Sequence, residues 1–552
     1  MVSNTDAINQ VRFEGSGTRA STVRGRIAES RISVVNPQSG AVEAVHLNPH
    51  VDFAASVPPT AGEKAKSLSQ PTAMVFNAAG DTLYAAAFGS AKVAALSVGD
   101  LTRARFAPDV ARHIDVPAGP AGLALNSAGT RLYVYSRIAH RIAIADTATR
   151  SVINTVPMFT PESSRTISGR NVLYDANLSS SNGTVACAAC HIFGDMDHLA
   201  WDLGNPDGAT FANNNAYVPN NPKTTLRFHP LKGPMTTQTL RGMAGNGPLH
   251  WRGDRSGSVR AQVRGQTESL EEAAFKEFNP AFVDLLGRAT PLSTDDMQSL
   301  TDFSMTLAMP PNPNRPLNGI LDSEQEAGRS IYFNQAFITL LGSCNSCHAM
   351  DPAQRKFGTG GLMAFEGGRI SENFKVPHLR NVYQKFGMFG FSAGSGTATG
   401  PQVRGFGFAH DGSVDTLETF FSDPVFIFPA PASLTRSQVA AFVAAADTDL
   451  APVVGQQVTW RPGSSAEQES RLNLLKQQAA VVSPRAVCDL VVRGAVDGVA
   501  SSGLLQTDGQ WRMRSGTTLS DTALRALATI NQPFTFTCVP PGSGRRIALN
   551  AG

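Results

Sequence analysis

The sequence has little charge. Asp, Glu, Lys and Arg make up 16% of its 552 residues, against roughly 25% in typical soluble domains. The 47 basic and 44 acidic residues leave a net charge of +3, which argues against a dedicated nucleic-acid binder. No run of eighteen apolar residues is present, so we expect no membrane-spanning helix.

The first residues also lack the basic and apolar regions of a secretory signal. The hydrophobic share of 42% is nevertheless sufficient for folded cores and excludes wholesale disorder. The 50 glycines and 34 prolines predict a chain rich in turns, and its length predicts three or four domains. Only six cysteines occur, but four of them stand in two identical short patterns.

The N-terminal part contains an internal repeat. Residues 71–84 are echoed by 120–133, and the strand-like run 92–97 is echoed by 141–146, both at an offset of 49. Short β-branched or alanine-rich runs alternate with Asn-x-x-Gly turns, which is typical of antiparallel meanders. The repeats resemble YVTN-type β-propeller blades. Only two or three blades are visible, whereas a closed propeller needs at least four, so we expect a partial propeller or, alternatively, an unrelated β-meander.

After residue 160 the pattern becomes helical. Apolar residues recur at helical spacing over 285–307 and 434–450, and the acidic residues that open 322–333 predict a helix start. From about residue 456 the chain forms a third region, with a stretch rich in Gly, Ser and Thr between its two cysteines.

The two identical cysteine patterns are Cys-x-x-Cys-His, the attachment signal of c-type haem. Two thiols on one helical turn can each bond a vinyl group of one porphyrin, and the next residue is placed to give the iron its proximal nitrogen. A thioredoxin-like pair would need a βαβ setting, and a zinc site formed by both motifs would not need the histidines. We therefore predict two covalently attached c-type haems, held by Cys187, Cys190 and His191 and by Cys344, Cys347 and His348.

The region 160–450 resembles the bacterial dihaem cytochrome c peroxidases, including their MauG-like relatives. Both haem motifs follow a Gly-Arg pair, Gly169-Arg170 in the first case and Gly328-Arg329 in the second. Four further segments carry the resemblance: Thr239–Arg241 with His250–Arg255, Ser269–Glu272, Phe374–Asn381, and His410–Glu418.

We therefore expect a multidomain chain. A partial, all-β propeller would occupy residues 1–158. Two mainly α-helical cytochrome c-type domains would follow, the peroxidatic one at 159–318 and the electron-transfer one at 319–455. A small C-terminal extension would occupy 456–552.

The resemblance implies an oxidoreductase that reduces H2O2 to water with electrons from a small donor protein, a cytochrome c or a cupredoxin. His191 would be the proximal ligand of the peroxide-reducing iron, and His348 that of the electron-transfer iron. The family's distal acid falls on Glu271, which would move a proton between the peroxide oxygens. The same segment also reads as an ordinary helix start capped by Ser269, and Glu272 is the neighbouring alternative.

The sequence departs from the family where further iron ligands are expected. Asp207 stands in place of a distal histidine, and Pro424 in place of a methionine. Trp251 is expected in a core or near the haems. His198, His229 and His250 are candidates near the first haem, and Met388 and His378 near the second.

These departures keep two other functions open: a MauG-like oxidase or oxygenase acting on a protein or organic substrate, and a non-enzymatic electron carrier. The resemblance also makes calcium a candidate ion, although the insertion at 392–408 alters the expected loop.

Cys488 and Cys538 lie outside the haem patterns. Covalent haem attachment implies an oxidising compartment, where a disulfide is expected and would stabilise the extension by roughly 4 kcal/mol; two free buried thiols are the alternative. We expect an exported protein, periplasmic or at the cell surface, whose sequence here begins downstream of its natural start.

Overall fold

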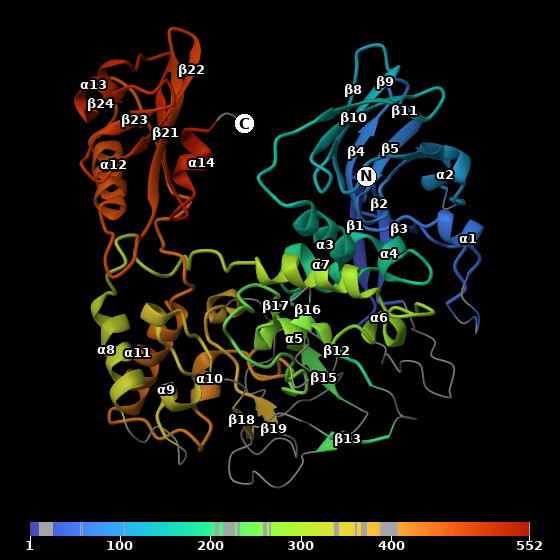
Figure 1. Ribbon diagram of the computed structural model, residues 1–552. Helices are drawn as coiled ribbons and strands as arrows, with labels where there is room; N and C mark the ends of the chain where they lie inside the picture. Colours follow the sequence, from blue (N-terminus) through green and yellow to red (C-terminus); the bar gives the residue numbers. More distant parts are fainter. Residues whose placement is uncertain are drawn as a thin grey trace. The chain divides into compact units, whose positions relative to one another are not determined.

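The N-terminal repeat folds into three antiparallel sheets, coloured blue to cyan in the computed structural model of Figure 1. Two are four-stranded meanders in sequential order, and one, formed before them in the chain, has three strands. The strands are β1 (Val2–Ala7), β2 (Ala28–Val35), β3 (Val42–His46), β4 (Pro71–Phe76), β5 (Thr82–Ala87), β6 (Lys92–Ser97), β7 (His113–Asp115), β8 (Pro120–Leu125), β9 (Arg131–Ser136), β10 (Arg141–Asp146) and β11 (Ser151–Pro157).

The structure describes residues 1–550 except 10–25, 54, 56, 58, 104, 205–208, 213–226, 229–231, 258–261, 264–265, 336–341, 359–361, 366–372 and 387–406. Within these residues the three sheets do not close into a ring, which agrees with the expected partial propeller.

The Asn-x-x-Gly turns explain why the two repeat units fold alike. The Asn77 side chain accepts a hydrogen bond from the Thr82 amide at 3.1 Å, and Asn126 accepts one from Arg131 at 3.0 Å. Gly80 and Gly129 take left-handed backbone angles, with φ of 72° and 68°, which favour glycine. The predicted hairpins are thus confirmed, because each turn is closed by its own side chain.

The sheets share a core with the helices that follow them. Phe88 packs edge-on against Tyr174 of α3 (Ser164–Tyr174), with ring centroids 5.2 Å apart. Lys64, in the short helix α1 (Ala61–Ala65), donates at 2.8 Å to the carbonyls of Asn177 and Ser180, at the end of α4 (Ala176–Ser179). The blades and the first helical region therefore belong to one packed body.

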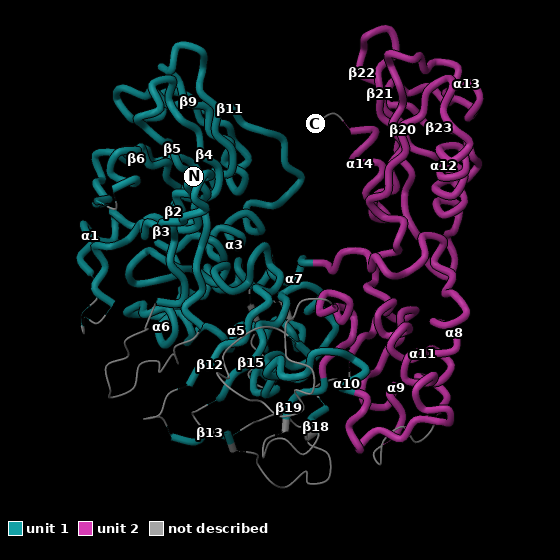
Figure 2. The backbone as a smooth tube through the Cα atoms, turned by 180° about the vertical axis from the view of Figure 1, so that it is seen from behind, with its two compact units in different colours: residues 1–307, 360–376, 387–420 teal, residues 308–359, 377–386, 421–552 magenta. Residues whose placement is uncertain are grey.

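The chain divides into two compact units, coloured separately in Figure 2. Unit 1 contains residues 1–307, 360–376 and 387–420, and unit 2 contains 308–359, 377–386 and 421–552. Two stretches expected in the second haem domain thus group with the first unit. The four expected domains stay a prediction.

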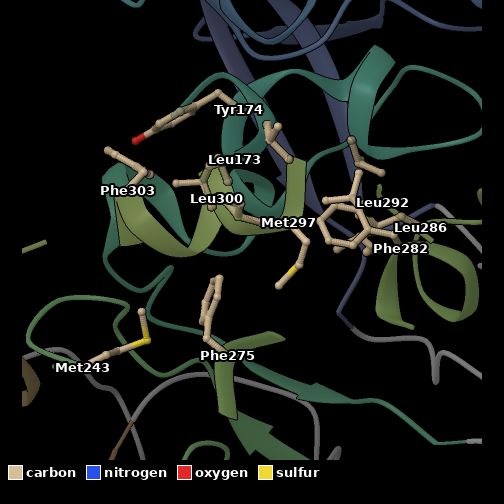
Figure 3. Close-up of a cluster of buried hydrophobic side chains, with 14 of the residues drawn as sticks. Leu173, Tyr174, Met243, Phe275, Phe282, Leu286, Leu292, Met297, Leu300 and Phe303 are labelled. Atoms are coloured by element: carbon tan, nitrogen blue, oxygen red, sulfur yellow. The ribbon is translucent and has the colours of Figure 1, made fainter. Parts of the chain in front are cut away.

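Both units contain a pair of helices that cross at a glycine. In unit 1, α3 crosses α7 (Thr294–Met305) at Gly169, where a Cβ atom would overlap the Ser299 carbonyl oxygen. In unit 2, α8 (Ser323–Asn334) crosses α11 (Ala432–Ala444) at Gly328, where a Cβ would overlap the Gln438 carbonyl oxygen. Figure 3 shows Leu173, Leu300 and Phe303 among the buried side chains of the first pair.

The predicted helices are confirmed, with shifted ends. The helix expected over 322–333 is α8, whose Asp322 caps the amides of Glu324 and Gln325. The one expected over 285–307 begins only at Thr294, because Ser293 caps the Asp296 amide and ends the preceding turn. The one expected over 434–450 ends at Ala444.

The C-terminal extension forms a sheet of order β20-β25-β21-β22-β23-β24. Trp511, Phe534 and Phe536 are fully buried on one face, against α12 (Ala466–Ala479) and α13 (Asp521–Ala526). Cys488 and Cys538 form the predicted disulfide. The strands are β20 (Gln457–Trp460), β21 (Asp489–Val496), β22 (Val499–Leu505), β23 (Trp511–Met513), β24 (Thr518–Leu519) and β25 (Phe534–Val539).

The remaining elements of the described residues are short. No helix of the described residues is long and apolar enough to cross a membrane. These elements are the strands β12 (Ala200–Asp202), β13 (Phe211–Ala212), β14 (Arg227–Phe228), β15 (Pro234–Thr236), β16 (Gln262–Val263), β17 (Gln266–Thr267), β18 (Met363–Phe365) and β19 (Asn373–Lys375), with the helices α2 (Val98–Leu101), α5 (Leu270–Lys276), α6 (Ala281–Asp284), α9 (Cys344–Cys347), α10 (Leu417–Phe421) and α14 (Gly544–Ala548).

Replacing either crossing glycine by alanine should destabilise its unit by more than about 2 kcal/mol, because the added methyl group forces two backbones apart. Gly169→Ala and Gly328→Ala should each lower the thermal midpoint. Gly62→Ala is the matched control, since nothing lies within 4 Å of its Cβ position. Equal midpoints for all three variants would refute the close-crossing argument.

The four-stranded sheet formed by β4 to β7 should lose stability in mild acid. Burial, aided by Lys92, lowers the pKa of His113 to about 4, whereas an unfolded histidine titrates near 6.5. The unfolded chain therefore binds the extra proton first, and stability falls as the pH drops from 6.5 towards 4, by about 2 kcal/mol at pH 4.5. Hydrogen-exchange protection of β6 and β7 measures the stability of this sheet at each pH. His113→Gln should remove most of the pH dependence. A variant with the same pH dependence as the parent protein would contradict the role of His113.

Candidate functional site

The first cysteine motif forms a single tight turn. Cys187 opens the 3₁₀ turn η3 (Cys187–Ala189), and its carbonyl accepts hydrogen bonds from the amides of Cys190 at 3.2 Å and His191 at 2.9 Å. Both thiols are free and partly buried against the core that contains Leu173 and Phe275. Two thiols and an imidazole are thereby held together on one turn.

The second motif repeats this arrangement on α9. Ser343 caps the helix by accepting from the Ser346 amide at 3.1 Å, and the His348 amide donates to the Cys344 carbonyl at 2.7 Å. Cys344 and Cys347 are free thiols. Tyr332, fully buried on α8, donates its hydroxyl hydrogen to the His348 carbonyl, so the helix that crosses at Gly328 also holds the motif.

The His348 ring has the tautomer that a metal ligand needs. Its Nδ1 lies 2.8 Å from the Pro377 carbonyl oxygen. A carbonyl only accepts, so Nδ1 carries the hydrogen and Nε2 keeps its lone pair. Burial lowers the pKa of His348 and so favours the neutral ring. The hydrogen bond to Pro377 acts in the opposite direction.

The first histidine, His191, is likewise partly buried, and its pKa is shifted in the same direction. Burial lowers the pKa of His191, while backbone groups of Asp195 and Gln238 act in the opposite direction. A neutral imidazole is the form that binds iron in c-type sites. The donor set of two thiols and one imidazole therefore fits a covalently bound haem at both motifs.

The electrostatics of the thiols argue against a redox dithiol. Burial raises the pKa of Cys187 and of Cys344 to about 11, and burial together with Asp197 raises that of Cys190 well above its usual value. Reactive cysteine pairs instead have lowered pKa values. Among the described residues, no three His, Cys, Asp or Glu side chains gather in a group that could hold a metal ion by itself.

The two adjacent glutamates of α5 have different roles. Glu272 closes a capping box: its carboxylate accepts from the Ser269 amide at 2.7 Å, while Ser269 accepts from the Glu272 amide. Glu271 instead accepts from the Gly247 amide at 2.8 Å, in the loop that leads to Trp251. The helix-start interpretation thus applies to Glu272, and Glu271 is the carboxylate directed at the neighbouring loop.

Trp251 lies at a junction of three segments in unit 1. Its indole N–H donates to the Thr236 carbonyl at 2.8 Å, and its side chain packs with Met235 and Phe374. Its own carbonyl accepts from the Lys375 amide at 2.8 Å. The interpretation of Trp251 as a core aromatic is confirmed.

The same junction contains His410 and a buried cation. Phe374 stacks on His410, with ring centroids 4.3 Å apart. The Lys375 ammonium donates to the Pro248 carbonyl at 2.7 Å, and burial lowers its pKa to about 8. Sequence reasoning assigned no role to Lys375; its place between the apolar residues Phe374 and Val376, both buried, was the available signal.

The other residues considered as iron ligands are found in different surroundings, and some lie outside the described residues. The His250 ring binds the nearly buried Asp254 carboxylate through Nδ1 at 2.6 Å, which supports a structural interpretation of His250. Pro424 lies in a turn closed by Asp423. His198 and His378 are both partly buried, with the Nδ1 atom of each ring shielded from solvent, and their proximity to an iron stays a prediction. His229, Asp207, Met388 and most of the 392–408 insertion lie outside the described residues.

Comparison with known proteins gives no family assignment. No protein-family model and no curated protein matches the chain. Among solved structures, hydrazine synthase of Kuenenia stuttgartiensis under xenon pressure shares 19% identity over 52% of this chain and 89% of its own, with a TM-score of 0.34. A MauG-like protein associated with microbial copper homeostasis shares 15% identity over 52% and 90%, with a TM-score of 0.28.

A β-propeller domain of Cps50 (Swd1) from Myceliophteria thermophila shares 20% identity over 21% of this chain and 32% of its own, with a TM-score of 0.15. Identities and TM-scores this low assign neither family nor activity.

Each motif should carry one covalent haem. The double variant Cys344→Ala/Cys347→Ala should lose the mass of one haem in denaturing mass spectrometry, and Cys187→Ala/Cys190→Ala the mass of the other. Cys488→Ser/Cys538→Ser is the control and should keep both, because this pair forms a disulfide. Bound zinc, or loss of haem from the control, would contradict the assignment.

Proposed function

We propose that this protein is a dihaem c-type peroxidase that reduces H2O2 to water with electrons from a small donor protein. The observation that carries the proposal is the recurrence of one arrangement, two free thiols and a partly buried imidazole on a single turn. In the second copy the Pro377 carbonyl holds the hydrogen of His348 on Nδ1 and leaves Nε2 for a metal.

Under this proposal, His191 and His348 are the proximal ligands, and the cysteines before them bond the porphyrins. Bound haem would supply one-electron redox chemistry and, at the first site, an iron able to bind peroxide. Each H2O2 takes up two electrons and two protons and yields two molecules of water. The chain must therefore deliver protons at one site and accept a donor at the other.

Glu271 is the proposed proton carrier. Its carboxylate lies in the first turn of α5 and is oriented by the Gly247 amide. An oriented carboxylate can take a proton from one peroxide oxygen and return it to the other. Glu272 is engaged in the capping box and has no such role.

The buried cations are proposed to face the anionic edges of the cofactors. Lys375 is buried in unit 1, and Arg380, 4% exposed, is buried in unit 2 above the Phe357 ring. Burial lowers the pKa of Arg380 to about 10. Carboxylate groups on a bound ligand would stabilise the charged forms of both side chains.

The donor is proposed to be a cytochrome c or a cupredoxin, and the compartment periplasmic or at the cell surface. Covalent haem and the Cys488–Cys538 disulfide both belong to oxidising compartments. Calcium remains a candidate ion of this proposal.

A MauG-like oxidase is the second candidate, and Pro424 favours it. The proline side chain has no donor atom for iron, so this position would not supply the methionine sulfur that raises a haem potential. The two functions are separated by turnover with reduced cytochrome c: a peroxidase oxidises two donors per H2O2, whereas the oxidase reacts slowly with the donor and oxidises a protein or organic substrate. A mere electron carrier would consume no peroxide.

Glu271→Gln should lower kcat for peroxide reduction by about 100-fold or more, because glutamine keeps the acceptor for the Gly247 amide but cannot carry the proton. Glu272→Gln is the matched control, since glutamine also closes a capping box, and it should stay within about twofold of the parent. Steady-state peroxide consumption at constant haem content measures both. Equal losses in the two variants would exclude Glu271 as the proton carrier.

A further inference from the structure

The two faces of the C-terminal sheet differ in what covers them. One face carries the core under α12 and α13. In the described part of the chain, the other face packs against the short helix α14, through a small cluster of Val491, Val539 and Ala548. Figure 1 shows α12 and α14 on opposite sides of β21. Much of the second face is therefore open.

The open face carries arginines from neighbouring strands. Arg493 of β21 lies opposite Ser502 of β22, and the Arg514 amide donates to the Ser502 carbonyl at 2.9 Å, so these residues form one row across three strands. Arg512 lies opposite Leu504, in the next row on the same face. At the usual spacing between neighbouring strands, the Cα atoms of Arg493 and Arg514 are about 10 Å apart.

Helix α14 adds two further arginines to this face. Arg493 donates to the Ile547 carbonyl at 2.7 Å, and Ser502 donates to the Ala548 carbonyl at 2.6 Å, which fixes the helix beside the row. Its Arg545 and Arg546 are exposed. We call Arg493, Arg512, Arg514, Arg545 and Arg546 the arginine face; all five side chains are exposed.

The ion pairs of the extension's acids lie away from this face, since Glu469 and Asp521 pair with Arg525 on the opposite side. Asp489 shares the face with Arg493, and its carboxylate accepts from the Gly544 amide. In the described part of the chain, none of the five arginines forms an ion pair with an acid of its own. Residues 456–552 contain ten basic and six acidic residues, so the positive excess of the whole chain originates here.

We propose that the arginine face binds an acidic protein surface through guanidinium–carboxylate pairs. Arginine presents a planar fork that matches a carboxylate, and interfaces between proteins are enriched in arginine and depleted in lysine. All five cations here are arginines. Single-stranded nucleic acid binds on exposed aromatic rings, and the described residues of the extension expose none.

The test measures binding of the full-length protein to a labelled polyglutamate peptide by fluorescence anisotropy, with an oligothymidine of equal charge as the competing probe. Arg512→Glu/Arg514→Glu should weaken peptide binding by about tenfold or more, and raised salt should weaken binding to the parent protein. Arg461→Glu/Arg471→Glu is the matched control: it reverses the same charge at exposed residues at β20 and α12, and should change binding less than about twofold.

Three results would overturn the proposal: no peptide binding by the parent protein, equal losses in the two variants, or tighter binding of the oligothymidine than of the peptide. Arg512→Gln/Arg514→Gln, which introduces no repulsion, separates loss of pairing from misfolding and should weaken binding in the same direction. Circular dichroism of each variant verifies the fold.

Discussion

Backbone-to-backbone contact between crossing helices is the constraint on which both proposed haem regions depend. At Gly169 and Gly328 no side chain separates the helices, and the carbonyls of Ser299 and Gln438 occupy the space that a Cβ would need. Close crossings of this kind leave no freedom for the helices to slide, because interiors are packed as densely as crystals. The turn that carries each cysteine motif follows in the chain from a helix fixed in this way.

The fold was predictable where local chemistry decides it. The hairpins at Asn77 and Asn126 are closed by their own side chains, and the start of α8 is capped by Asp322, so neighbouring residues contain the information. The grouping into units was not predictable. Residues 360–376 belong to unit 1 through long-range contacts such as Lys375 with Pro248, which no local pattern indicates.

In the candidate site, too, some features follow from neighbouring residues and others only from long-range contacts. The cysteine motifs are recognisable in the sequence because all their donors lie within five residues. Glu271 and Glu272 are adjacent and chemically alike, and the structure separates their roles through their partners, the Gly247 amide and the Ser269 cap. The Pro377 carbonyl that orients His348 lies 29 residues away along the chain. A backbone carbonyl carries no sequence signature, so only the structure could reveal it.

The buried cations connect folding with the proposed cofactors. The Lys375 ammonium is buried and donates a hydrogen bond to the Pro248 carbonyl. Its lowered pKa reflects the free-energy cost of keeping a charge in a buried position. Burial also lowers the pKa of Arg380, which lies beside the Phe357 ring. A ligand with carboxylates would offset these costs, and whatever binds only the folded chain stabilises it by mass action. Under the proposal, haem attachment would therefore contribute to the stability of both units as well as to their chemistry.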